Sequence, residues 1–221
     1  MPSRTLIVVA VAGVLAAAGA GLYVTTRPEA GPTPAFFRGE PTSALYAPIA
    51  TRRLDPRPLT GQEVFGTSPR VTAQGVTMER GQVTVSDDCA EALWGSEVKA
   101  AASGCARVVR GGFAGAGGGV AGEYAVFDMA DGASADRLVA ALDPRRGGGF
   151  LRPAPGRQAF DAARSRAEVR ALGHFVVVNW VGPVGNRVGP VGDVGGADLT
   201  FPQLALDGLG AFAQARVLAA G

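Results

Sequence analysis

The run HFVVVNWV, His174 to Val181, is the segment of this 221-residue chain that most clearly decides its fold. It is rich in β-branched and aromatic residues, which predicts a strand. Two more runs have this character, CARVVRGGF at Cys105–Phe113 and EYAVFDM at Glu123–Met129. A glycine-rich stretch separates these two, so they are expected to pair as a hairpin. The alternation at Val83–Val85 predicts a fourth, shorter strand.

Three helical segments are expected around these strands. Asp88, with Glu91 three residues later, predicts a helix start, and alanine-rich sequence carries that helix to about Ser103. GASADRLVAAL at Gly132–Leu142 is a second helix, and Leu199–Ala220 is the last. The resulting order, β-α-β-β-α-β with an extra C-terminal helix, predicts an α+β domain with a ferredoxin-like arrangement.

An uncharged and mostly apolar stretch, residues 5–26, precedes the domain. At about 1.5 Å per residue its length is sufficient for one transmembrane helix. Arg4 before the stretch favours a single-pass protein of the cell membrane, with residues 1–4 in the cytoplasm and the body outside. The alternative is a cleaved signal peptide and a secreted protein, because Ala18–Ala20 fits an A-x-A cleavage site. Both interpretations predict export.

Small residues recur every four positions within this stretch, at Gly13, Ala17 and Gly21. They would share one helix face, which allows close packing against another membrane helix. The alternative is that this spacing arises by chance in a run so rich in alanine and glycine.

Prolines mark the segment that follows the apolar stretch. Seven of the chain's 15 prolines lie in residues 27–58, which predicts a semi-rigid spacer there. Thr60 and Glu63 then fit a capping box that starts a short helix. The extracytoplasmic domain is therefore expected over residues 59–221.

Cys89 and Cys105 are the only two cysteines, and both lie in the part expected to be exported. In an oxidising compartment an isolated pair usually forms a disulfide. An unbroken helix between them would separate their Cα atoms by about 20 Å, whereas a bridge requires about 4.4–6.8 Å. The expected disulfide therefore requires a helix break at Gly95, with Ser96 capping a second helical piece.

Three motifs resemble a family of uncharacterised exported proteins of actinobacteria: DCAEALWG at Asp88–Gly95, SGCARVVR at Ser103–Arg110, and DPRPLT with EVF at Asp55–Phe65. Proteins of that family are similar in plan, with an N-terminal apolar span, a proline-rich spacer and a small domain with one cysteine pair. The resemblance implies a membrane-anchored exported protein, and it supplies no activity.

No catalytic constellation is recognisable in the sequence. The G-x-G-x-x-G string at Gly117–Gly122 leads into a predicted strand rather than a helix, which favours a hairpin turn over a dinucleotide site. His174 is the only histidine and no G-x-S-x-G motif accompanies it, so a half-buried strand position is favoured over a catalytic base or metal ligand. With two cysteines and one histidine, neither a bound metal nor a cofactor is expected.

The largest charge feature lies in residues 145–170, where seven arginines outnumber Asp161 and Glu168. It predicts a surface that binds an anionic polymer or the bilayer, the alternative being a solvated helix face and loop. Nucleic acid is not expected as a partner, because the whole chain carries only +2 and few aromatics are interleaved. The seven are Arg145, Arg146, Arg152, Arg157, Arg164, Arg166 and Arg170.

These observations together predict a membrane-anchored extracytoplasmic binding or structural module without a catalytic site. Its expected partners are the membrane, through the N-terminal span, and a membrane protein or a cell-envelope component. The alternative is a secreted or anchored enzyme that acts on cell-envelope material. A deep pocket with converging acids near His174 or the glycine loops would favour the enzyme, and a shallow surface with an exposed apolar or basic patch would favour the binding module.

Overall fold

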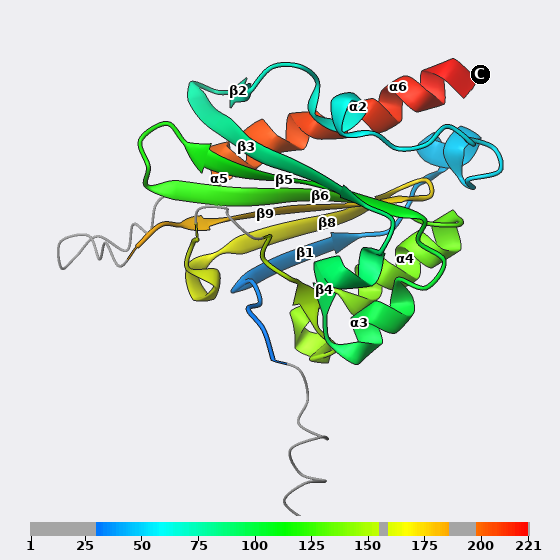
Figure 1. Cartoon of the computed structure of the whole chain (residues 1–221), viewed down its shortest axis with the longest axis horizontal. Coiled ribbons are helices and arrows are strands. Elements are labelled where there is room, and N and C mark those ends of the chain that lie inside the picture. Colours follow the sequence, from blue (N-terminus) through cyan, green and yellow to red (C-terminus); the bar gives the residue numbers. More distant parts are fainter. Residues whose placement is uncertain (1–29, 155–158, 186–197, 221) are drawn as a thin grey trace, which may run out of the picture.

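The computed structural model describes residues 30–154, 159–185 and 198–220. Within them the chain forms a large twisted sheet with helices on both of its faces (Figure 1). The strands are β1 (Phe36–Glu40), β2 (Arg70–Ala73), β3 (Val76–Ser86), β4 (Leu93–Trp94), β5 (Arg107–Gly115), β6 (Val120–Asp128), β7 (Phe150–Leu151), β8 (Arg166–Leu172) and β9 (Phe175–Pro183).

The helices are short, as their bounds show. The α-helices are α2 (Gly61–Phe65), α3 (Ser96–Ala101), α4 (Gly132–Ala141), α5 (Thr200–Asp207) and α6 (Ala211–Ala220). The 3-10 turns are η1 (Ala44–Ile49), η2 (Cys89–Ala92), η3 (Pro144–Arg146), η4 (Ala162–Arg164) and η5 (Gly208–Gly210).

Seven strands form the large sheet in the order β1-β8-β9-β6-β5-β3-β2, and β4 pairs with β7 separately. β1 runs parallel to β8, and every other neighbouring pair in the large sheet is antiparallel. β9, the strand that HFVVVNWV predicted, is buried at every position between β8 and β6. The β5–β6 hairpin across the glycine-rich turn is confirmed, as is the helix that begins at Gly132.

The prediction of a ferredoxin-like domain is wrong. That arrangement requires the strands before and after each helix to be parallel and separated by another strand. Here β3 and β5, which flank η2 and α3, are antiparallel neighbours. The sheet also contains three strands that the sequence analysis did not predict, namely β1, β2 and β8. The result is a seven-stranded mixed sheet, not a four-stranded βαββαβ sheet.

The charged residues of β8 are the reason that this strand was not predicted from the sequence. Its sequence, RAEVRAL, begins within the arginine-rich residues 145–170, for which no strand was predicted, although polar and apolar residues alternate along it. Ala167 and Val169 are buried against the α3–α4 side, whereas Arg166, Glu168 and Arg170 are half-buried on the opposite face. The period of two is the normal signature of a strand, and its charged half faces the partly covered side of the sheet.

β1 lies within the stretch whose prolines predicted a spacer. Its residues pair in parallel with β8, from Phe36 beside Arg166 to Glu40 beside Arg170. An edge strand tolerates neighbouring prolines, because only one side of it needs backbone donors. The folded domain therefore includes residues N-terminal to the boundary expected at residue 59.

Two apolar cores lie on the two faces of the large sheet. The first is covered by α3 and α4 and contains Trp180, whose ring makes edge-on contacts with Phe150 and Phe160, each at 5.0 Å between centroids. The second is covered by α2, α5 and α6 and contains Phe175 and Tyr124. We call these the α3–α4 face and the α5–α6 face.

Candidate functional site

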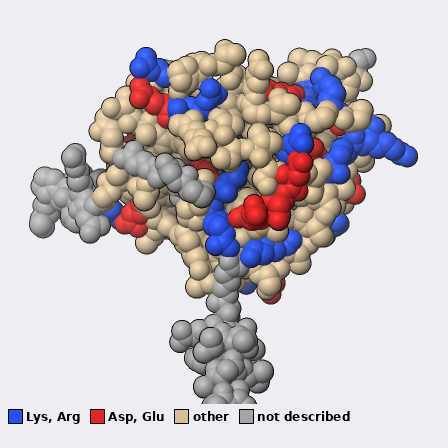
Figure 2. Space-filling view, in the orientation of Figure 1, with Lys and Arg blue, Asp and Glu red and all other residues tan. Residues whose placement is uncertain are grey.

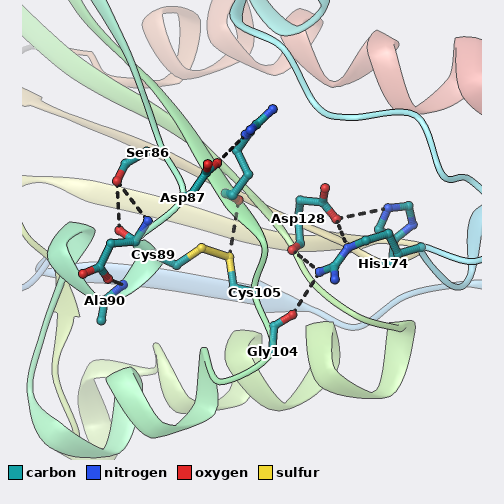
Figure 3. Close-up of a disulfide and its surroundings, with 11 residues drawn as sticks. Ser86, Asp87, Cys89, Ala90, Gly104, Cys105, Asp128 and His174 are labelled. Atoms are coloured by element: carbon teal, nitrogen blue, oxygen red, sulfur yellow. Dashed lines mark hydrogen bonds and ion pairs between the residues drawn. A yellow bond between two sulfur atoms is a disulfide. The ribbon is translucent and has the colours of Figure 1, made fainter.

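The disulfide between Cys89 and Cys105 is present, with the two Cα atoms 6.2 Å apart (Figure 3). It joins η2 to the residues just before β5. Asp88 caps η2 by accepting a hydrogen bond from the backbone of Ala90 at 2.9 Å. The bridge closes a 16-residue separation, and a loop of that size is stabilised by about 3 kcal/mol.

The helix break that the disulfide required occurs at Gly95. η2 ends at Ala92, and α3 begins at Ser96 after the short strand β4. The expected cap at Ser96 is wrong, because Gly95 is the N-cap residue of α3 and no side chain among the described residues caps this helix. Gly95 has a positive φ of 87°, and its backbone passes so close to Gly148 and Gly149 that a Cβ atom would overlap them. Glycine is therefore needed at this position both for its conformation and for the close approach of two chain segments.

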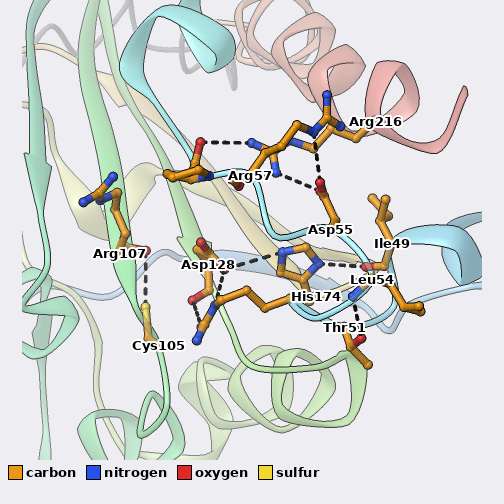
Figure 4. Close-up of polar contacts among 12 residues, drawn as sticks. Ile49, Thr51, Leu54, Asp55, Arg57, Cys105, Arg107, Asp128, His174 and Arg216 are labelled. Atoms are coloured by element: carbon orange, nitrogen blue, oxygen red, sulfur yellow. Dashed lines mark hydrogen bonds and ion pairs between the residues drawn. The ribbon is translucent and has the colours of Figure 1, made fainter. Parts of the chain in front are cut away.

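His174 is completely buried, directly before β9 (Figure 4). Its Nδ1 donates to the carbonyl oxygen of Ile49 at 2.8 Å, and its Nε2 lies 3.5 Å from Asp128 Oδ1. Burial lowers the pKa of His174, although the nearby carboxylates of Asp128 and Asp55 act in the opposite direction. A neutral imidazole with no exposed surface stabilises the fold here, and substrate cannot reach it.

A second buried polar cluster attaches α6 to the segment before α2. Arg216 has a side chain that is 1% exposed, and its guanidinium binds Asp55 Oδ2 at 2.7 Å and Glu63 Oε1 at 2.7 Å. It also donates to the carbonyl oxygen of Arg57 (Figure 4). It lies over the ring of Phe175, 5.0 Å from the ring centroid. These contacts use the charge of Arg216 to hold the C-terminal helix in place.

The described arginines of the predicted anionic-polymer surface do not form one patch. Arg145 pairs with Asp143 beyond α4, and Arg164 pairs with Asp161 at η4. Arg152 follows β7 and donates to a backbone carbonyl of β4.

The remaining members of the set lie on β8, on η3 or outside the described residues. Arg166 lies over the ring of Phe36 at 5.3 Å, and Arg170 pairs with Asp207; both project from the α5–α6 face of β8. Arg146 is exposed on η3, and Arg157 lies outside the described residues. On the face seen in Figure 2, basic and acidic side chains are interspersed. Polymer binding by these arginines stays a prediction.

The clearest candidate for a binding site is a pocket of about 170 Å³ on the α5–α6 face, which we call the β8–η5 pocket. It lies where β8, η1 and the turn from α5 to α6 meet. Arg170 and Asp207 form an ion pair in its wall at 2.8 Å, and each side chain is 23% exposed. Its lining includes Tyr46, Arg170, Leu172, Asp207, Gly210 and Gln214.

Two buried polar atoms accompany this pocket. Tyr124 on β6 and Asn179 on β9 are direct cross-strand neighbours, and both side chains are almost completely buried. The hydroxyl of Tyr124 and Oδ1 of Asn179 have no hydrogen-bond partner among the described residues. Asn179 Nδ2 donates to Asp207 Oδ1 at 3.1 Å, which links Asn179 to the wall of the pocket.

The Tyr124 hydroxyl lies beneath Gly210. A Cβ atom added to Gly210 would be 3.7 Å from this hydroxyl and 3.6 Å from a terminal nitrogen of Arg170. Burial raises the pKa of Tyr124, with the nearby Asp207 acting in the same direction and Arg170 against it, so the hydroxyl is a neutral donor at physiological pH. Burial also raises the pKa of Glu168, which lies beside Asn179 in the sheet.

A second hollow, of about 390 Å³, lies beside η2 and α3. Asp88, Glu91, Lys99 and Arg152 line it, so it presents charges of both signs. No aromatic side chain lines it, and it is more open than the β8–η5 pocket. In the described ranges, no three His, Cys, Asp or Glu side chains gather as a group that could hold a metal ion.

The N-terminal predictions fall outside the described residues. Residues 5–26, with Gly13, Ala17 and Gly21, precede residue 30, where the described chain begins. Among the residues that are described, no helix is long and apolar enough to cross a membrane. The membrane anchor and its helix-packing face therefore stay predictions.

Comparisons with protein-family models, with curated proteins and with solved structures gave no match to this chain. The resemblance to exported actinobacterial proteins accordingly stays a prediction. The β8–η5 pocket brings together side chains from η1, β8, α5 and α6, and of its lining only Arg170 belongs to a set that the sequence analysis had singled out.

Proposed function

We propose that this protein is an exported binding module, tethered to the cell membrane by its N-terminal apolar stretch. The Cys89–Cys105 disulfide is the observation that carries the proposal, because such bonds persist in oxidising compartments and are rare in the cytosol. The apolar residues 5–26 supply the means of export, either as an anchor or as a signal peptide.

A binding role is supported by how the polar groups are arranged. A deep pocket with converging acids near His174 or the glycine loops would favour the enzyme alternative, and the imidazole of His174 is fully buried. The β8–η5 pocket instead has one ion pair, amide and phenol groups, and apolar side chains. Sites that bind small ligands orient them with a few fixed polar groups of this kind.

Export can be tested on the protein in its own cells. Membranes and medium are collected, thiols are alkylated with and without prior reduction, and the intact mass is measured. The proposal predicts full-length protein in the membrane fraction, alkylated at both cysteines only after reduction. A species that begins near Gly21 in the medium would replace the tether with secretion, and thiols that react without reduction would contradict export.

A further inference from the structure

We propose that the β8–η5 pocket binds a neutral polyhydroxylated ligand, namely one sugar unit of a glycan. This inference deepens the proposed function and rests on it, because an exported module meets the glycans of the cell envelope. It is based on three observations: the cancelled charge of the pocket, the unpartnered polar atoms buried beneath it, and its mixture of aromatic and aliphatic walls.

The charge of the pocket favours a neutral ligand. Arg170 and Asp207 neutralise each other at 2.8 Å, and Asn179 also donates to the same carboxylate oxygen. An anionic ligand would have to compete with Asp207 for the guanidinium, and a cationic ligand would have to compete with Arg170 for the carboxylate. A hydroxyl group avoids this competition, because it both donates and accepts hydrogen bonds without bringing a charge.

The unpartnered atoms match the same chemistry. The Tyr124 hydroxyl is a neutral donor and acceptor, and Asn179 Oδ1 is an acceptor. Both are buried beside the ion pair, where an unpaired polar group is unfavourable. Of the two, Tyr124 lies nearer the pocket, because its hydroxyl is 3.7 Å from the position of a Cβ atom at the lining residue Gly210, whereas Asn179 is linked to the pocket through Asp207. A ligand hydroxyl that enters beside Gly210 can therefore pair with the Tyr124 hydroxyl.

The walls and size of the pocket set the number of sugar units. Tyr46 supplies an aromatic ring, and Leu172 supplies an aliphatic side chain, so the C–H faces of a sugar ring would have apolar partners. The volume of about 170 Å³ is below the range of about 300–1,000 Å³ that accommodates drug-sized ligands. The pocket therefore suits a single ring at the end of a glycan rather than a longer oligosaccharide.

Four sugars that share one ring but differ in charge test the ligand class. Glucose and N-acetylglucosamine are neutral, glucosamine is cationic at mildly acidic pH, and glucuronate is anionic. Binding to the full-length oxidised protein is measured by saturation-transfer NMR in a detergent without a sugar headgroup. We expect a neutral sugar to bind with a roughly millimolar dissociation constant, and the charged sugars to bind at least about tenfold more weakly.

Two substitutions test the location. Gly210→Ala places a methyl group 3.6–3.8 Å from Arg170, Tyr124 and Leu172, at ordinary contact distance, so it occupies part of the pocket without a clash. It should weaken binding at least about tenfold. The matched control is Gly117→Ala in the β5–β6 turn, where the added methyl meets nothing within 4 Å; it should leave binding unchanged.

Tyr124→Phe separates binding from structure. The substitution removes a hydroxyl that has no partner among the described residues and keeps the ring, so the free energy of unfolding should stay the same or rise. Binding of the neutral sugar should weaken roughly three- to tenfold. A purely structural tyrosine would show the reverse pattern, with lower stability and unchanged binding.

The outcomes distinguish this inference from the proposed function. The sugar site is overturned if the oxidised wild-type protein binds none of the four sugars, or if the Gly210→Ala variant binds them as well as the wild type does. Neither result affects the proposal of export. If glucuronate or glucosamine binds more tightly than the neutral sugars, the ligand class is overturned. If the thiols are free in cells while the purified oxidised protein binds a neutral sugar, the proposed function fails and the pocket assignment holds.

Discussion

Different contacts hold the covering elements on the two faces of the sheet. On the α3–α4 face, backbone and covalent contacts add to the apolar core: the disulfide holds η2 to the residues before β5, and Gly95 and Gly149 approach too closely for a Cβ atom on either. On the α5–α6 face, charged side chains hold the covering elements, with Arg216 binding both Asp55 and Glu63. The α3–α4 face also contains one buried ion pair, Arg110 with Glu123.

This difference indicates where ligand binding is compatible with stability. A face closed by glycine contacts and a disulfide tolerates few changes, because neither contact has spare space. On the α5–α6 face, long charged side chains hold the covering elements and pack less tightly. The β8–η5 pocket lies on this face, beside Arg170 and Asp207. Substitutions on the two faces should therefore differ in effect, from failure to fold down to a change in pH dependence.

The largest effect is expected where the backbone segments cross. Gly149→Ala would place a methyl group on the carbonyl oxygen of Trp94, at a φ of +125° that side chains disfavour. We expect no folded protein. Gly147→Ala is the matched control, because it also has a positive φ, +71°, but meets nothing within 4 Å. That change should cost only about 1–2 kcal/mol, as measured by denaturant unfolding. Equal losses in both variants would contradict the importance of the crossing.

Removing the buried guanidinium should have the next largest effect. Arg216→Met leaves Asp55 buried without its main partner, and losing one member of such a pair costs about 3–5 kcal/mol. The control is Arg57→Met, whose side chain is 53% exposed and pairs with the same carboxylate from the surface. It should cost less than about 1 kcal/mol. Denaturant unfolding of both variants tests the contrast, and a cost for Arg57 that equals the cost for Arg216 would overturn it.

Loss of the disulfide should have the third largest effect on stability. Replacing Cys89 and Cys105 together with alanine should lower the free energy of unfolding by about 3 kcal/mol relative to the oxidised protein. Reducing the wild-type protein should give a similar loss, and the double variant should not respond to reductant. Thermal unfolding with and without reductant measures this. An oxidised wild type no more stable than its reduced form would show that the α3–α4 face does not depend on the bridge.

The sequence predicted the local elements better than their arrangement. HFVVVNWV, the β5–β6 hairpin, the Thr60 cap and the break at Gly95 depend on residues close together in the chain, and all four are found. β1 and β8 pair across about 130 residues, so no local pattern indicated that a proline-rich segment and an arginine-rich segment lie side by side. Strict alternation in RAEVRAL was the one signal that would have found β8.

The candidate site was even less predictable. Its lining comes from η1, β8, α5, η5 and α6, with β6 and β9 beneath it, and the fold brings these elements together. Arg170 was identified only as one of seven arginines, and Tyr124 only as part of a strand. Whether Tyr124 lacks a hydrogen-bond partner depends on what lies opposite it in the fold, and the sequence contains no local signal for that.

The smallest expected effect concerns the pH dependence of stability. His174 is the only histidine, and burial lowers its pKa in the folded protein. As the pH falls through about 6.5, the unfolded chain therefore takes up a proton that the folded protein refuses, and stability falls, by at most about 1.4 kcal/mol per pH unit. The groups that act on His174 are Asp128, Asp55 and Arg216, besides its bond to Ile49.

His174→Asn isolates this contribution, because asparagine can still donate to the carbonyl oxygen of Ile49 but does not titrate. Glu168 has a raised pKa and contributes with the opposite sign above its unfolded value, but it is present in both proteins and cancels in the comparison. Denaturant unfolding at several pH values between neutrality and mild acid should give a flatter pH dependence for the variant than for the wild type. If the wild type is instead equally stable throughout this interval, the buried imidazole accepts its proton within the folded protein, with Asp128 as its counter-ion. The polar cluster beneath α6 would then tolerate a positive charge on His174, which burial is expected to exclude.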